Sequence, residues 1–465
     1  MRTLSIVLFI FFVSIAMSAQ DITGQWNGVL KVQGMQLRVV FNVTKSGAFY
    51  TSTMDSPDQG AAGIPVTQTT FVNSTIKFEV TNARIQYNGA LKNDEIVGTF
   101  KQGGQEFPMN LSRKTIEKEV IKRPQEPTKP YSYYSEDVTF PNAKANISLA
   151  GTLTLPKKEG NYPVVILISG SGAQNRDSEL LGHKPFLVIS DYLTKNGIAV
   201  LRYDDRGFGQ STGDFKTATS ADFATDVESA VAYLKTRKEI NLKKIGLMGH
   251  SEGGIIAPMV AAKSKDISFI VLLAGTGIQG DKLLLLQQEL IARANGASEA
   301  EIKTTFQNNS KLFEMVVKST DLQKLKTELT TKINELIKND NSTEIPNGMT
   351  KEQYIALQVN QITNPWMQYF LKYNPQPTLE KVKCPVLAVN GEKDLQVPPK
   401  QNLTAIKNAL IKGGNKNVTT IEFPNLNHLF QESTTGSPSE YATIEQTFSP
   451  VALNEITKWI QKQTE

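Results

Sequence analysis

Five consecutive residues, Gly249-His250-Ser251-Glu252-Gly253, place a hydroxyl nucleophile between two glycines. A short, mainly apolar run, 244–248, precedes them and another, 254–262, follows, which predicts a buried strand, a sharp turn and a helix. A serine on such a turn has a strained backbone that exposes its hydroxyl above a sheet. A Cβ atom on either glycine would collide across so tight a turn, so both positions need glycine. With its hydroxyl exposed on such a turn, Ser251 is predicted to be a nucleophile.

A second copy of the same pattern, Gly209-Gln210-Ser211-Thr212-Gly213, lies in a different context. The predicted strand 198–203 is separated from this serine by residues 204–210, and the polar stretch 214–217 follows in place of a helix. Without a strand-to-helix turn around it, Ser211 is predicted to be a loop residue.

A serine nucleophile needs a base to accept its proton and an acid to orient that base. His428 follows the apolar strand 420–423, which places it at a carboxyl end of the predicted sheet and makes it the predicted base. Asp394 follows the strand 384–389 and is the predicted acid, with Glu392 as the alternative. The order Ser251, Asp394, His428 is the order found in α/β-hydrolases.

The chain has two further histidines. His250 precedes the nucleophile, where we expect the turn to direct its ring to the other side, in a structural role. His183 opens a predicted helix far upstream, and we expect it on the surface or on a pocket rim.

Two backbone amides are needed to stabilise the oxyanion of an acyl-transfer intermediate. One is expected from Glu252, the residue after the nucleophile. The other is expected from the glycine-containing loop that follows the strand 164–168, with Ser171 and Gly172 as the two candidates. The Glu252 side chain has a simpler role available, as a carboxylate at a helix N-terminus.

The composition excludes several classes of partner. The 465 residues are enough for more than one domain. The charges nearly balance, with 50 Lys and Arg against 45 Asp and Glu, and the sequence has no long basic block, so nucleic acid or an anionic membrane is not expected as the main partner. A single cysteine, Cys384, permits neither an intramolecular disulfide nor a cysteine-based metal cluster.

The N-terminus has the pattern of an export signal. Arg2 is followed by the apolar run from Leu4 to Met17, which is shorter than the roughly 17–25 residues of a spanning helix. Small residues then precede Gln20, so residues 1–19 are predicted to be a cleaved signal peptide, with a retained membrane anchor as the alternative. We therefore expect a periplasmic or secreted protein whose mature chain has no stable membrane span.

Residues 20–113 and 131–465 have different patterns, joined by a charged and proline-punctuated linker at 114–130. The first segment predicts a small all-β domain, an antiparallel barrel or sandwich of about eight strands, for which a packing or spacer role is favoured over ligand binding. The second predicts an α/β doubly wound sheet.

A helical stretch at about 276–379 interrupts the α/β rhythm and predicts a cap inserted over the carboxyl ends of the strands. Its apolar run Leu283–Leu286 and its aromatic residues Trp366, Tyr369 and Phe370 either line an acyl pocket or pack the cap onto the core. Packing is the commoner role for such residues, and we favour it.

Residues 131 to 465 resemble the α/β-hydrolase superfamily. The resemblance rests on four segments: Gly249-His250-Ser251-Glu252-Gly253-Gly254, Arg206-Gly207-Phe208-Gly209-Gln210-Ser211, Asn390-Gly391-Glu392-Lys393-Asp394 and Asn427-His428. The loop 170–177 is similar to that of bacterial exported carboxylesterases with a helical cap and a small N-terminal β-domain. Ser169 departs from the His-Gly that many relatives carry. The resemblance implies hydrolysis of small-molecule carboxylic esters without a cofactor or metal.

Three classes of function compete on this sequence. A serine esterase uses the triad Ser251, Asp394 and His428 directly. A serine peptidase on the same triad is the alternative, with Glu252 and Asp177 available to bind a substrate ammonium group. A protein that only binds ligands is the third, and a complete triad argues against it.

Overall fold

The computed structural model describes residues 21–32, 35–47, 49–59, 61–102, 105–117, 122–339, 345 and 349–465. The predicted signal peptide, residues 1–19, lies outside the described residues. Contacts within the chain divide it into two compact units, whose main boundary lies between Lys118 and Glu119.

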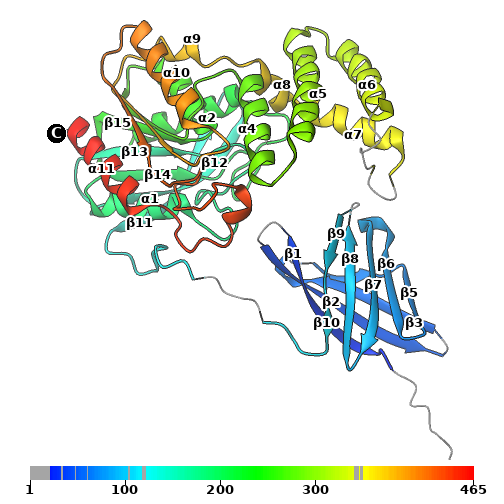
Figure 1. The fold of residues 1–465 in the computed structure, drawn as a ribbon. Coiled ribbons are helices and arrows are strands. Elements are labelled where there is room, and N and C mark those ends of the chain that lie inside the picture. The colour runs from blue at the N-terminus through cyan, green and yellow to red at the C-terminus, as the bar shows by residue number, and fades with distance from the viewer. Residues whose placement is uncertain are drawn as a thin grey trace, which may run out of the picture. The chain divides into compact units, whose positions relative to one another are not determined.

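The first unit is a single antiparallel sheet that curls into a half-barrel (Figure 1). Its strand order is β4-β3-β2-β1-β10-β8-β7-β6-β5, with β9 beside β8. The predicted small all-β domain is confirmed: of the two predicted forms, barrel or sandwich, the single curled sheet is nearer the barrel, and the described residues contain ten strands where the sequence predicts about eight. The strands are β1 Gly24–Val32, β2 Met35–Ser46, β3 Phe49–Ser56, β4 Ala61–Pro65, β5 Gln68–Val72, β6 Thr75–Val80, β7 Ile85–Lys92, β8 Glu95–Gln102, β9 Gln105–Pro108 and β10 Leu111–Ser112.

Aromatic side chains fill the concave face of this sheet. The rings of Phe41 and Phe78 stack at 4.1 Å between centroids, and both are fully buried. The hydroxyl of Tyr87, buried beside them, donates to the carbonyl oxygens of Ile96 and Met109. Because alternate residues of each strand point to this face, the period-2 pattern of the sequence produces a packed core.

The second unit is built on a mainly parallel sheet with the order β11-β12-β14-β13-β15-β16-β17-β18. The leading pair is antiparallel, β12 also runs antiparallel to β14, and the remaining neighbours are parallel. The bounds are β11 Tyr134–Asn142, β12 Ile147–Leu155, β13 Tyr162–Ile168, β14 Ala199–Tyr203, β15 Ile240–His250, β16 Ile267–Leu273, β17 Val386–Gly391 and β18 Val418–Phe423.

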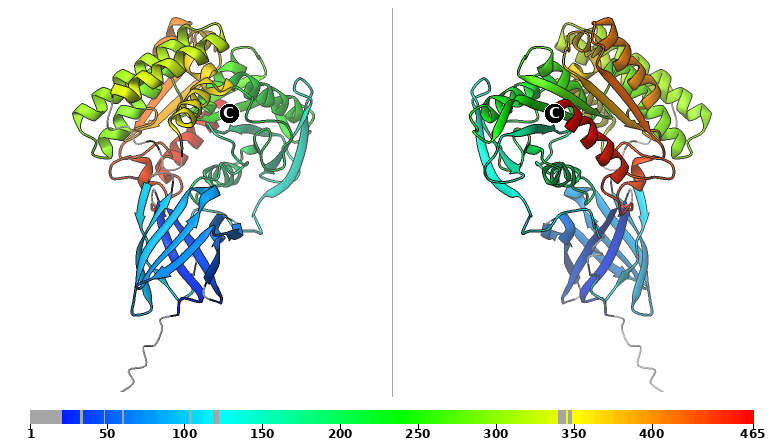
Figure 2. Two further views of the ribbon diagram at one scale, coloured as in Figure 1. Left: turned by 90° about the vertical axis from the view of Figure 1, so that its right-hand side faces the viewer. Right: turned by 90° about the vertical axis from the view of Figure 1, so that its left-hand side faces the viewer.

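Helices cover both faces of this sheet. On one face, α2 (Ser220–Leu234), α3 (Gly253–Ala261) and α10 (Pro399–Lys412) contribute to one apolar cluster. On the other, α1 (Pro185–Lys195) and α11 (Pro450–Thr464) pack in a second cluster (Figure 2). The continuous apolar strands are buried on both sides, so the predicted doubly wound α/β sheet is confirmed.

Six helices occupy the described residues between β16 and β17: α4 Gly280–Ala294, α5 Glu299–Lys318, α6 Leu322–Asn339, α7 Lys351–Thr363, α8 Pro365–Lys372 and α9 Gln376–Leu379. Leu285, Val316 and Leu371 contribute to a separate apolar core within them. Leu283 and Phe370 belong instead to the apolar cluster between the parallel sheet and helices α2, α3 and α10. None of the helices in the described residues is long and apolar enough to cross a membrane.

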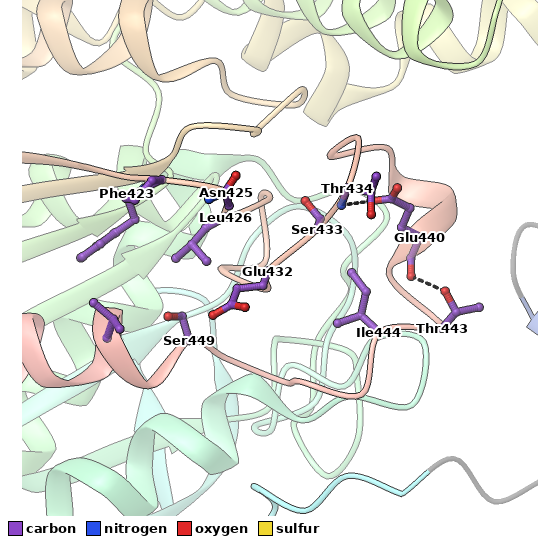
Figure 3. A pocket seen from close by; sticks show the side chains of 12 residues that line it. Phe423, Asn425, Leu426, Glu432, Ser433, Thr434, Glu440, Thr443, Ile444 and Ser449 are labelled. Atoms are coloured by element: carbon purple, nitrogen blue, oxygen red, sulfur yellow. Dashed lines mark hydrogen bonds between the residues drawn. The ribbon is translucent and has the colours of Figure 1, made fainter.

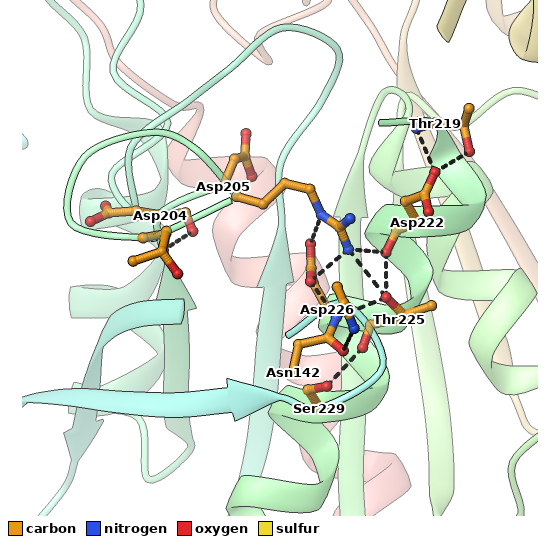
Figure 4. A network of polar contacts seen from close by, with 12 residues as sticks. Asn142, Asp204, Asp205, Thr219, Asp222, Thr225, Asp226 and Ser229 are labelled. Atoms are coloured by element: carbon orange, nitrogen blue, oxygen red, sulfur yellow. Dashed lines mark hydrogen bonds and ion pairs between the residues drawn. The ribbon is translucent and has the colours of Figure 1, made fainter. Parts of the chain in front are cut away.

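A buried ion pair fastens β11 and α2 to the loop after β14 (Figure 4). Arg206 Nε and Nη2 donate to the two oxygens of Asp226 at 2.7 and 2.9 Å. Asn142 at the end of β11 adds a third bond to Asp226 at 2.7 Å. The three side chains are buried, so the Asp226 carboxylate depends on Arg206 and Asn142 to replace the hydrogen bonds of water.

Replacing Asp226 with alanine is expected to lower the free energy of unfolding by about 3–5 kcal/mol, because the buried Arg206 charge loses its counter-ion and keeps only neutral acceptors, the Asp222 carbonyl and Thr225 Oγ1. Urea unfolding followed by circular dichroism measures this change. Glu314→Ala is the matched control, since the Glu314–Lys318 pair is exposed, and it should leave the urea midpoint nearly unchanged. Equal midpoints for the two variants would contradict the role of the buried pair.

Candidate active site

Ser251 lies on the turn between β15 and α3. Its backbone φ is +54°, in the left-handed region, and its amide donates to the carbonyl of Leu273 on the neighbouring strand at 2.8 Å. A Cβ atom at Gly249 would lie 2.0 Å from the carbonyl oxygen of Gly253, and one at Gly253 would lie 2.3 Å from that of Ile168. Both glycines are therefore required for the strand and the helix to approach this closely.

His428 and Asp394, which the sequence places at the carboxyl ends of two strands, meet in the structure. His428 Nδ1 lies 2.8 Å from Asp394 Oδ2, and both side chains are buried. The other oxygen of Asp394 accepts the backbone amides of Gln396 and Val397, each at 2.8 Å. A carboxylate fixed in this way requires a proton on Nδ1, which leaves Nε2 of His428 free to accept one.

His250 joins the nucleophile turn to this histidine. The two imidazole rings lie 4.8 Å apart between centroids, and His250 Nε2 donates to the backbone oxygen of His428 at 2.9 Å. Burial lowers the pKa of His250 to about 3, so its ring is neutral. The expectation that the turn directs His250 away from the site is wrong, because the left-handed residue Ser251 breaks the simple alternation of side chains along a strand.

Within the described residues, no hydrogen bond joins Ser251 Oγ to His428. The two are neighbours through His250, which is adjacent to Ser251 in sequence and bonded to the His428 backbone. Nucleophile–base bonds are often long in enzymes without substrate and shorten when it binds.

The loop after β13, residues 169–174, lies against the nucleophile. A Cβ atom at Gly170 would lie 3.2 Å from the Cβ of Ser251 and 3.5 Å from His250 Nδ1. In the part of the chain that the structure describes, the amides of Ser171, Gly172 and Glu252 donate to no backbone or side-chain acceptor. Among the described residues, none of the three expected oxyanion donors therefore has a hydrogen-bond acceptor.

Asp205 holds this loop at both ends. Its carboxylate accepts Ser169 Oγ at 2.5 Å and the amide of Gln174 at 2.8 Å. Burial raises the pKa of Asp205 to about 7. Asp205 carried no sequence signal beyond its place after a strand, because the bonds that reveal its role join segments about 30 residues apart.

The Glu252 side chain connects the nucleophile turn to the cap. One of its oxygens accepts Ser220 Oγ at 2.5 Å and Trp366 Nε1 of α8 at 2.8 Å. The carboxyl group is buried, and burial raises its pKa. Trp366 and Tyr369 also pack against the apolar core.

The remaining sequence candidates have other partners. Ser211 is buried, donates to the Asp204 carbonyl and accepts the amide of Ala150, so its hydroxyl braces a loop. Glu392 accepts the amide of Asn425. His183, expected at the surface, is buried with 1% of its area exposed and contacts residues of the 431–447 segment.

A pocket of about 730 Å³ opens behind the loop that carries His428 (Figure 3). It is lined by Phe423, Leu426, Glu432 and Glu440 among others, and none of the predicted triad residues lines it. We therefore do not assign the substrate to it. Among the described residues, no group of three or more His, Cys, Asp or Glu side chains is arranged to hold a metal ion.

A model of the alpha/beta hydrolase fold family matches residues 163–434. The chain is 25% identical over 337 residues to the esterase EstD of Thermotoga maritima, covering 72% of this chain and 69% of EstD. It is 25% identical over 272 residues to an uncharacterized 31.7 kDa protein of Escherichia coli, covering 58% of this chain and 85% of that protein.

Two solved structures align with part of this chain. The esterase Pf2001 of Pyrococcus furiosus aligns with a TM-score of 0.44 at 15% identity, over 75% of this chain and 100% of that one. Est1E of Butyrivibrio proteoclasticus, solved with ferulic acid bound, aligns with a TM-score of 0.40 at 17% identity, over 70% and 97%. Since the family match spans more than half of the sequence, the chain belongs to the α/β-hydrolase family and is a hydrolase of the esterase-like type.

Proposed function

We propose that the protein is a serine esterase that cleaves small carboxylic esters through an acyl-enzyme on Ser251. The observation that carries this proposal is the 2.8 Å contact of His428 Nδ1 with a carboxylate that two backbone amides already hold. That arrangement fixes the tautomer in which Nε2 is a base. The esterase EstD, similar over most of the chain, supports the same reaction class.

In the proposed reaction, His428 Nε2 takes the proton of Ser251 as Oγ attacks the ester carbonyl. The amide of Glu252 and one amide of the 169–174 loop stabilise the resulting oxyanion. The same imidazolium then protonates the leaving alkoxide, and water repeats the sequence to release the acid. Asp394 orients the imidazole and stabilises the imidazolium.

The peptidase alternative has less support from the contacts. Asp177, which could bind a substrate ammonium group, forms an ion pair with the buried Arg202. Glu252 accepts bonds from Ser220 and Trp366, and its raised pKa reduces the charge that it can offer to a cation. An amine is also a poorer leaving group than an alkoxide, so it needs more help from the acid.

The comparison that tests the proposal is kcat/KM for p-nitrophenyl acetate and butyrate against aminoacyl- and prolyl-p-nitroanilides, on the same purified protein. We expect the ester values to be higher. Anilide values equal to or above the ester values would establish the peptidase assignment instead.

Ser251→Ala is expected to reduce kcat by about 10⁴-fold or more while the protein stays folded. Ser211→Ala is the matched control from the second copy of the motif. It should keep activity and lose about 1–3 kcal/mol of stability, because the Ala150 amide and the Asp204 carbonyl lose a buried partner. A fluorophosphonate probe attached to Ser211 in place of Ser251 would refute this assignment.

Asp205→Ala is expected to lower kcat by about 10²-fold, since the loop that supplies an oxyanion donor is released at both ends. Asp205→Asn can keep one bond to each of Ser169 and Gln174, so it should retain most of the activity. Ester hydrolysis at saturating substrate measures kcat for both variants. An equal loss of kcat in the two would contradict the role of Asp205 in holding the loop.

The natural protein and Asp205→Asn together give a test of pH dependence. The folded-state pKa of Asp205 is raised to about 7 from 3.8, so the folded protein holds this proton more tightly than the unfolded chain does. Its contribution to stability therefore decreases as pH rises from about 4 to about 7. The unfolding free energy of the natural protein relative to Asp205→Asn should fall across that range.

A further inference from the structure

The segment 122–131, here called the strap, lies far upstream of the catalytic residues but belongs to the second unit. The guanidinium of Arg123 donates to the carbonyl oxygens of Gly182 at 3.2 Å, Leu181 at 3.4 Å and Ala442 at 2.9 Å, and also to that of Ile444. One side chain thus ties two loops together. These loops are 181–182, before α1, and 442–444, before α11.

Gln125 binds the same segment a few residues further on, at Thr447 and Phe448. Its Nε2 donates to the Phe448 carbonyl at 2.6 Å, and its Oε1 accepts the amides of Thr447 and Phe448 at 2.7 and 3.0 Å. Three backbone groups that no helix or strand pairs are satisfied by one primary amide. Removing it would leave half-buried backbone groups without partners.

The bound loop leads to the catalytic histidine through His183. Thr447 Oγ1 lies 3.0 Å from His183 Nδ1, and His183 Nε2 lies 2.9 Å from the Tyr441 carbonyl. Burial lowers the pKa of His183 to about 4, so its ring is neutral. A neutral ring that carries its proton on Nδ1 can donate it to the Thr447 hydroxyl, which leaves Nε2 as an acceptor.

Gln431 completes the connection. Its Nε2 lies 3.0 Å from His183 Nε2, and its Oε1 accepts Asn427 Nδ2 at 2.9 Å. The backbones of Asn427 and Gln431 are also bonded, and both residues are fully buried. Asn427 directly precedes His428, so the chain of contacts ends at the predicted base.

Tyr441 reaches the same site by a second route. Its hydroxyl accepts Gln396 Nε2 at 3.0 Å. The amide of Gln396 in turn donates to Asp394. The loop fastened by the strap therefore borders both members of the His428–Asp394 pair.

We propose that Arg123 and Gln125 are positioning residues for His428: the strap fixes the 424–449 segment, and that segment fixes the imidazole relative to Ser251. This inference rests on the proposed function. The segment runs between β18 and α11 with little regular structure, and it has two left-handed residues, Asn425 and Phe430. Such a segment needs partners from elsewhere in the chain to hold one conformation.

The test replaces Gln125 with methionine, which has a similar length and lacks the amide, in the full chain. We expect kcat and the rate of fluorophosphonate labelling of Ser251 to fall roughly ten- to hundred-fold, because both need a well-placed base. KM should be unchanged, because the strap holds the base and not the substrate. Lys122→Ala, at an exposed position of the same strap, is the matched control and should retain full rates.

Folding of each variant is checked by circular dichroism and urea unfolding. Unchanged labelling in folded Gln125→Met, or a rise in KM alone, would overturn the proposal. If that variant does not fold, Arg123→Lys decides, because a lysine keeps the charge and cannot bond to four carbonyls at once. Failure of both to fold would make the strap a folding element and also overturn the inference. A natural protein that the probe does not label would instead refute the esterase proposal.

Discussion

The close approach of β15 and α3 around Ser251 is the constraint on which the rest of the site depends. The backbones of Gly249 and Gly253 leave no room for a Cβ atom, and Ser251 has a left-handed conformation that serine rarely adopts. Strain of this kind persists only where the surroundings fix it. Here they include the bond from Ser251 to Leu273 on β16 and the burial of every residue of α3.

Around this turn, three buried carboxyl side chains each hold a different part of the site in place. Asp205 fixes the loop expected to supply an oxyanion donor, Asp394 fixes His428, and Glu252 fixes the cap against the turn. Each has at least two hydrogen-bond partners. A buried carboxyl group with one partner would be costly, whereas one with several can specify a single arrangement of loops.

The sequence predicted those parts of the fold and site that have local patterns. Apolar runs predicted the sheet, and the positions after three of its strands predicted Ser251, Asp394 and His428 as a triad, in which His428 Nδ1 lies 2.8 Å from Asp394 Oδ2. The roles of His183, His250 and Asp205 could not be predicted. Their partners are remote in sequence, and the direction of the His250 ring depends on a left-handed neighbour. Arg123 and Gln125 fall in a stretch whose prolines and charges indicate a linker, and nothing local shows what they bind.

The bond between Trp366 and Glu252 has an optical consequence. Of the three tryptophans in the chain, Trp26 is buried in the first unit and Trp459 packs against Phe269 from α11. Trp366 alone among them bonds to the residue beside the nucleophile. An indole is sensitive to the charge and polarity at its N–H, so a change in Glu252 or a lift of α8 alters its emission. A chain in which the other two are phenylalanine would carry one natural fluorophore at the junction of cap and nucleophile, and cap motion during turnover could be followed by light without any attached label.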